Sequence, residues 1–130
     1  MHKKYVAHIF AKFEYFLEEV KRCSNLENKT IYYSTWFKRR GNFVDYDFKV
    51  IYIDARTLPI EIFEYSIWGY VEVEKAIKVI KKDFKRFIKI LKKLAKMGFN
   101  VTKISPEEFN KIIDELYIKL TNKPHYYVLL

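Results

Sequence analysis

Residues 30 to 52 read TIYYSTWFKRRGNFVDYDFKVIY, and this stretch decides the fold. Both of its halves are rich in β-branched and aromatic residues, which favour β-strands. The pair Gly41-Asn42 between them suits a two-residue hairpin loop in which glycine takes a positive φ. The stretch therefore predicts an antiparallel hairpin whose register is set by the turn. The opposing pairs are Arg40 with Phe43, Lys38 with Asp45, Trp36 with Asp47, Ser34 with Lys49 and Tyr32 with Ile51.

This register divides the hairpin into two faces, because side chains alternate along a strand. One face is almost wholly apolar and is predicted to be the core: Ile31, Tyr33, Thr35, Phe37, Val44, Tyr46, Phe48, Val50 and Tyr52. The other face is predicted to look toward water or a partner: Tyr32, Trp36, Lys38, Arg40, Asp45, Asp47 and Lys49.

Helical periodicity is found on both sides of the hairpin. Residues 3 to 22 place apolar side chains three and four residues apart, which predicts an amphipathic helix. Residues 71 to 97 repeat this spacing as a heptad seam and predict a long helix that is ended by Gly98. A further helix is predicted to begin at Ser105-Pro106, with serine as the N-cap, and to end at residues 122 to 124.

A single α+β domain spanning residues 1–130 is the expected fold, because this length suits one core. Ile60 to Tyr65 is predicted to be a third strand, and Gly69 to mark a bend. The hairpin would extend to a sheet of three or four strands, preceded by an N-terminal helix and followed by the long basic helix and a C-terminal helix. Because the heptad seam needs a partner inside the fold or across a dimer, we expect a homodimer.

The charge balance favours an anionic partner. The chain holds 25 basic and 16 acidic residues, for a net charge of +9. Nucleic acid is the first candidate, with a membrane surface or an acidic protein second. One cysteine and three scattered histidines argue against a disulfide framework and a zinc cluster, so no cofactor is expected. We see no signal peptide and no apolar run of about 18 residues, and we expect a cytoplasmic protein that is not in a membrane.

The long helix carries ten of the basic residues between Lys75 and Lys96. Such a ridge predicts contacts with phosphates and binding that weakens with salt. The alternative is a solvated lysine-rich face. The chain has no glutamine and abundant Lys, Glu, Ile and Tyr, a composition that favours a hyperthermophile or its virus, although an AT-rich genome gives a similar one. The residues assigned to this ridge are Lys78, Lys82, Lys85, Arg86, Lys89, Lys92 and Lys96.

The polar face of the hairpin is the second candidate for nucleic-acid binding. Unpaired bases stack on aromatic side chains while cations hold the phosphates between them, which is how single strands are bound without sequence recognition. The alternative is that another element covers Tyr32 and Trp36, either the first helix or a second subunit. The hairpin residues assigned to binding are Tyr32, Trp36, Lys38, Arg39, Arg40 and Lys49.

A metal-dependent nuclease is a minor alternative. Asp47-Phe48-Lys49 matches the D-x-K end of a pattern in which carboxylates hold Mg²⁺ and lysine assists the attacking water. Asp45 is too close to Asp47 to be the other ligand, although Glu14, Glu18 or Glu19 of the first helix could supply the glutamate. No other catalytic motif is found, and we predict no catalytic or metal-binding residue.

The chain ends in an apolar segment, Tyr126 to Leu130. Packing onto the protein's own sheet is the simpler interpretation of this tail. The alternative is a docking peptide for a partner protein, because an exposed sheet edge accepts such a strand.

In length, basicity, apolar C-terminal end and the aromatic content of WFKRRGNF (residues 36 to 43), the chain resembles the rudiviral single-stranded-DNA-binding proteins of crenarchaeal viruses. Those proteins are compact α+β dimers without an OB fold. The resemblance implies single-stranded DNA as the ligand and a host cytoplasm as the location, and it carries over no functional residue.

We therefore expect a non-enzymatic protein that binds nucleic acid, preferably single-stranded DNA, through the basic helix face and the hairpin. The alternative is a protein-interaction or assembly module that forms a homodimer and has no nucleic-acid role.

Overall fold

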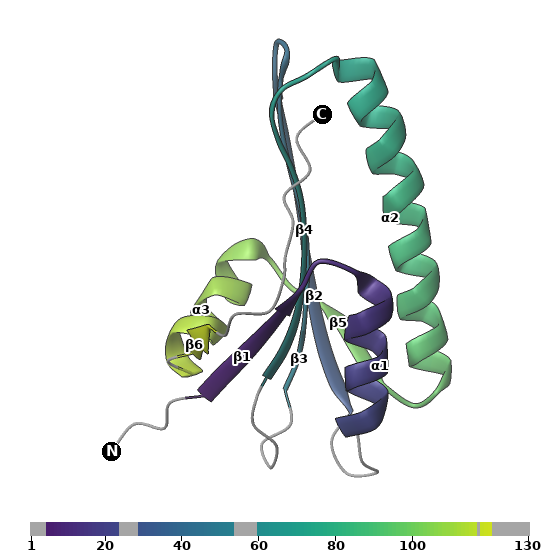
Figure 1. Ribbon diagram of the computed structural model, residues 1–130, viewed down its shortest axis with the longest axis vertical. Coiled ribbons are helices and arrows are strands. Elements are labelled where there is room, and N and C mark those ends of the chain that lie inside the picture. The colour runs from purple at the N-terminus through teal and green to yellow at the C-terminus, as the bar shows by residue number, and fades with distance from the viewer. Residues whose placement is uncertain (1–4, 24–28, 54–59, 117, 121–130) are drawn as a thin grey trace.

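The computed structural model describes residues 5–23, 29–53, 60–116 and 118–120, which form a mixed β-sheet with helices on both faces (Figure 1). The predicted α+β class is confirmed. Six strands lie in the order β5-β2-β3-β4-β1-β6, two more than the largest number predicted. Their bounds are β1 Tyr5–Phe10, β2 Thr30–Arg40, β3 Phe43–Tyr52, β4 Ile60–Tyr70, β5 Asn100–Lys103 and β6 Ile118–Leu120.

The hairpin of β2 and β3 has the predicted register. Arg40 lies opposite Phe43, and the pairing continues to Ile31 opposite Tyr52. Gly41 has a φ of 56°, which an L-residue with a Cβ adopts less readily, so the turn depends on glycine as expected. Because the turn and the alternation of side chains act locally, the sequence alone was sufficient to predict this pairing.

β4 continues the hairpin into a three-stranded antiparallel meander. It pairs with β3 along its whole length, from Glu61 opposite Tyr52 to Tyr70 opposite Phe43. The strand predicted to stop at Tyr65 therefore runs on to Tyr70. Gly69 does not end it, although its φ is 135°.

The N-terminal segment corrects the prediction of one helix over residues 3 to 22. The structure has β1 first and then helix α1, Phe13–Cys23. β1 pairs in parallel with both β4 and β6, so both of its edges are paired within the sheet. Ala7 and Ile9 are buried toward one face and Phe10 toward the other. A strand buried on both faces carries apolar residues on both, and its spacing can then resemble a helix.

Two helices cover one face of the sheet. These are α1 and the long helix α2, Val73–Lys96, which lie on the same side in Figure 1. The predicted heptad seam of α2 packs largely on this sheet, with Ile80, Phe87 and Leu91 buried against it. The seam is therefore satisfied within one chain and does not require a second subunit. Gly98 ends the helix as predicted, with its N–H donating to the carbonyl of Ala95 at 3.1 Å.

The third helix, α3, Pro106–Leu116, covers part of the opposite face. It begins with the predicted capping box, in which the N–H of Glu108 donates to Oγ of Ser105 at 3.1 Å. Phe109 is buried between this helix and the sheet. The helix ends at Leu116, and residues 118–120 form β6 beside β1, so the predicted extension to residues 122–124 is wrong. The tail from Tyr126 to Leu130 lies outside the described residues.

Residues 34–40, 43–49 and 64–70 form a part of the meander that we call the ribbon. It extends past the other strands, because β5 pairs with β2 only up to Tyr33 and β1 pairs with β4 only up to Phe63. Figure 1 shows α2 running along one side of the ribbon and α3 near its base on the other side. We call the α3-side surface of the ribbon its open face, since beyond α3 no described element covers it.

The predicted division into core and solvent faces is correct along most of the hairpin. Val44, Tyr46 and Phe48 are buried toward α2. Phe37 was predicted to be in the core and is 48% exposed. The reason is that Phe37 lies on β2, which is the edge strand of the ribbon within the described residues, while the core beneath α2 is centred on β3 and β4.

Candidate nucleic-acid interface

The open face of the ribbon carries large exposed aromatic side chains. Trp36 on β2 is 41% exposed, and Trp68 and Tyr70 on β4 are 56% and 84% exposed. Phe43 on β3 lies next to the last two, with ring centroids 5.2 Å from each in edge-on geometry. These rings form a surface on which flat ligands could stack.

Trp36 is oriented by a hydrogen bond. Its Nε1 donates to Oδ2 of Asp45 on the neighbouring strand at 3.1 Å. The contact satisfies the indole N–H and leaves 41% of the side chain exposed. Trp36 is therefore accessible in this chain, which a stacking role requires.

The basic residues of the hairpin tip divide between the two faces of the ribbon. Lys38 and Arg40 lie on the open face, where together with Phe43, Asp45 and Tyr70 they line a shallow hollow of about 390 Å³. Arg39 points to the other face, as strand alternation requires, and its Nε donates to the carbonyl of Gly41 at 3.4 Å. Of the three consecutive cations, two therefore accompany the exposed aromatic residues.

Two of the predicted hairpin residues are less accessible than the others. Tyr32 is half-buried and packs against the apolar cluster beneath α3. Another element therefore covers this residue, but it is α3 and not the first helix, because α1 packs on the opposite face of the sheet. Lys49 is also half-buried, and its Nζ lies 3.8 Å from Oε1 of Glu64. Lys49 lies at the base of the ribbon and Tyr32 lies just below it, where α3 covers the sheet.

Trp68 and Tyr70 were not identified from the sequence. They lie beyond the predicted end of the third strand, so no face was assigned to them. The alternation of Glu64, Ser66, Trp68 and Tyr70 with the more apolar residues between them is the signal that could have found them. Gly69 obscured it, because glycine within a strand usually indicates a bend or bulge.

A second, more enclosed hollow of about 270 Å³ lies at the base of the open face. We call it the base pocket. Its walls come from β2, β3 and the first turn of α3, and they include Ser34, Trp36, Asp47, Lys49 and Asn110. Ser34 is only 3% exposed, and Asp47 is held by a hydrogen bond of 2.5 Å from Oγ of Ser66 to Oδ1.

The basic ridge of α2 is exposed, but it lies on the other side of the sheet from the open face. All seven predicted cations of the ridge are exposed. Within the described residues, Arg86 alone of these seven has an acidic side chain within 4 Å, with NH1 lying 3.9 Å from Oε1 of Glu14. The ridge points away from the sheet, since the opposite side of α2 is buried against it. The two predicted binding surfaces are therefore separated by the thickness of the sheet and do not form one groove.

The carboxylates of the nuclease hypothesis are separated in the same way. Asp47 lies on the α3 side of the sheet, whereas α1, with Glu14, Glu18 and Glu19, packs on the opposite side. Those glutamates cannot reach a metal at Asp47. Within the described ranges, no three His, Cys, Asp or Glu side chains are grouped so that they could hold a metal ion.

On the α2 side of the sheet, Tyr46 and Tyr65 lie near Asp83, the acidic residue in the middle of α2. The hydroxyl of Tyr65 donates to Oδ2 of Asp83. Burial raises the pKa of Tyr65 above its ordinary value, and this hydrogen bond raises it further. Burial also raises the pKa of Tyr46, with smaller contributions from the charges of Asp83 and Asp47. Both hydroxyls therefore stay protonated above the pH at which a free tyrosine ionises.

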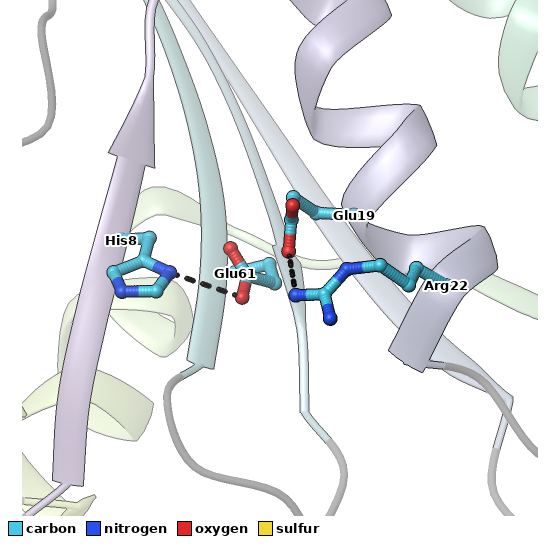
Figure 2. Close-up of polar contacts among 4 residues, drawn as sticks. All are labelled: His8, Glu19, Arg22 and Glu61. Carbon is cyan, nitrogen blue, oxygen red and sulfur yellow. Dashed lines mark hydrogen bonds and ion pairs between the residues drawn. The ribbon is translucent and has the colours of Figure 1, made fainter.

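A further polar cluster lies where α1 approaches β1 and β4 (Figure 2). Nδ1 of His8 is 3.2 Å from Oε1 of Glu61, a carboxylate that is only 1% exposed. On α1, NH2 of Arg22 donates to Oε2 of Glu19 at 2.7 Å. When His8 is protonated, its charge stabilises the carboxylate of Glu61, whose ionised form burial disfavours.

Comparisons with protein-family models, with curated proteins and with solved structures found no match to this chain. None of the helices within the described ranges is both long enough and apolar enough to cross a membrane.

Proposed function

We propose that this protein binds single-stranded DNA on the open face of the ribbon. The observation that carries the proposal is the gathering of Trp36, Trp68 and Tyr70, all exposed, beside Lys38 and Arg40 on one face. Aromatic rings accept the faces of unpaired bases, and neighbouring cations hold the phosphates. Duplex DNA keeps its base faces stacked inside the helix, so this combination favours single strands.

The ridge on α2 has a different role in this proposal. Because it lies across the sheet from the aromatic residues, the same few nucleotides cannot contact both surfaces. Its exposed lysines add a positive field that raises the rate of encounter with a polyanion. A longer strand could pass around the edge of β2 from one surface to the other.

The test is binding of a fluorescein-labelled 12-mer oligo(dT), measured by anisotropy at two salt concentrations, with a 12-base-pair duplex of equal length as the control. We expect tighter binding of the single strand, and an affinity that falls steeply with salt as counterions are released. Absence of binding at low salt, or tighter binding of the duplex, refutes the proposal.

A protein-interaction module is the second candidate, and the open face also favours it. Exposed apolar patches often mark interfaces with other proteins. A second copy of this chain is the simplest such partner, in line with the expected homodimer. Sedimentation distinguishes the two functions: a dimer that forms through Trp68 and Tyr70, and that does not bind the oligonucleotide, supports the interaction module.

A further inference from the structure

The base pocket has a charge opposite to that of the protein as a whole. Three carboxylates line it, from Asp45, Asp47 and Glu107, against one ammonium group, that of Lys49. A phosphate group entering this pocket would meet net negative charge. The chemistry of the pocket therefore suits a neutral ligand that offers hydrogen-bond donors.

One wall of the pocket is aromatic. Trp36 contributes to it, and its indole is held in place by the bond to Asp45. A few residues along the same strand, Lys38 and Arg40 lie on the same face and are placed to hold phosphates outside the pocket. A volume of about 270 Å³ lies just below the usual range for pockets that hold drug-sized ligands, which suits one planar heterocycle. These features fit a single nucleobase of a strand bound along the open face.

The hydrogen-bonding groups of the pocket distinguish among the bases. The carboxylate of Asp47 has about four acceptor positions, of which one is used by Ser66. Lys49 follows two residues later on the same face of β3, about 6.6 Å further along the strand, and its 3.8 Å contact with Glu64 leaves it able to donate elsewhere. A ligand here therefore meets an acceptor pair beside a cationic donor.

Guanine matches this arrangement. Its Watson–Crick edge offers two adjacent N–H donors, at N1 and N2, which can bond both oxygens of a carboxylate, and an acceptor at O6, which can bond an ammonium group. Thymine offers one N–H between two carbonyl oxygens, and those oxygens would face the carboxylate unfavourably. Single-stranded bases are commonly read on this edge while they stack on aromatic side chains.

We propose that the base pocket selects guanine over thymine within a bound single strand, with Asp47 and Lys49 recognising the Watson–Crick edge. This inference rests on the proposed function, because it requires a strand on the open face. It adds sequence preference to a surface that otherwise binds any base.

The experiment measures the dissociation constants of two labelled 12-mers in lithium buffer, which disfavours guanine quadruplexes. One is oligo(dT), and the other carries a single central dG. We expect the dG oligonucleotide to bind about fivefold or more tightly, since a good bidentate contact discriminates between bases by at least that factor. In Asp47→Asn the ratio of the two constants should fall to about one. In the matched control Asp114→Asn, an exposed carboxylate of α3 outside the pocket, the ratio should persist.

The possible results separate this inference from the proposed function. Equal binding of both oligonucleotides, or an undiminished ratio in Asp47→Asn, overturns the guanine preference and leaves the proposed function intact. Equal affinity for a central dC overturns it too, because one amino donor would then suffice. Failure to bind either oligonucleotide refutes the proposed function itself. Binding of an arginine-rich peptide that is lost in Asp47→Asn, without any preference among oligonucleotides, would assign the pocket to a protein ligand instead.

Discussion

Replacing Trp68 with alanine should weaken binding of single-stranded DNA without unfolding the protein. Removing an aromatic side chain on which a base stacks costs about 1–3 kcal/mol, which corresponds to roughly a 5- to 150-fold higher dissociation constant. Replacing a fully buried tryptophan with alanine lowers the free energy of unfolding by about 3–5 kcal/mol. Trp68 is 56% exposed, so we expect its replacement to lower the free energy of unfolding by about 1–2 kcal/mol. This figure includes the loss of the edge-on contact with Phe43.

The matched control is Phe37→Ala. Phe37 is exposed to a similar degree, at 48%, and lies on the same ribbon but on the opposite face. Anisotropy titrations of oligo(dT) should therefore show a clear loss for Trp68→Ala and little change for Phe37→Ala, while thermal unfolding confirms that both variants are folded. Because neither change removes a charge, the slope of affinity against salt should stay the same.

Two results would refute the reasoning. If both variants weaken binding equally, the open face has no special role, and any exposed aromatic residue of the ribbon contributes. If Trp68→Ala binds as tightly as the wild-type protein, bases do not stack on Trp68.

Three further predictions concern charge, capping and buried tyrosines. Arg40→Ala should weaken oligo(dT) binding and lower the slope of log affinity against log salt concentration by about 0.7, the value for one lost phosphate contact on a single strand. Arg39→Ala, on the other face, should change this slope less. Equal slopes for the two variants would contradict the division of the arginines between the faces. Ser105→Ala should lower the free energy of unfolding in urea by about 1 kcal/mol through loss of the helix cap, and an unchanged midpoint would show that the cap is dispensable. The raised pKa values of Tyr46 and Tyr65 predict that the free energy of unfolding falls as the pH rises above the ordinary tyrosine value of 10.0, because the unfolded chain then releases protons that the folded chain retains. In urea titrations at high pH, Tyr46→Phe should reduce this loss of stability. A loss as steep as in the wild-type protein would contradict the prediction.

The buried hydroxyl of Tyr46 also affects the free energy of unfolding at neutral pH. Within the described part of the chain its hydroxyl is buried and has no hydrogen-bond partner. Leaving a buried polar group unpaired is costly, so Tyr46→Phe should be neutral or stabilising before any effect of pH is considered.

The sequence by itself determined the features that depend on near neighbours. The register of β2 and β3 follows from Gly41 and from the alternation of side chains, and both act within a few residues. The ends of α2 at Gly98 and of α3 at Ser105 follow from capping groups adjacent to the helix. The register also assigned Trp36 to the polar face, but whether another element covers it depended on the tertiary structure.

Only the tertiary structure decided which surfaces lie together. β1 is a strand because β4 and β6 pair with its two edges, and those partners are more than 50 residues away in the chain. Phe37 is exposed because β2 is the edge strand of the ribbon within the described residues, and the pairing of β4 with β3 continues far enough to present Trp68 and Tyr70. The sheet also separates the basic ridge of α2 from the open face. Local patterns specify which side of an element is apolar, but the packing of distant elements determines which surfaces are covered and which remain accessible to a ligand.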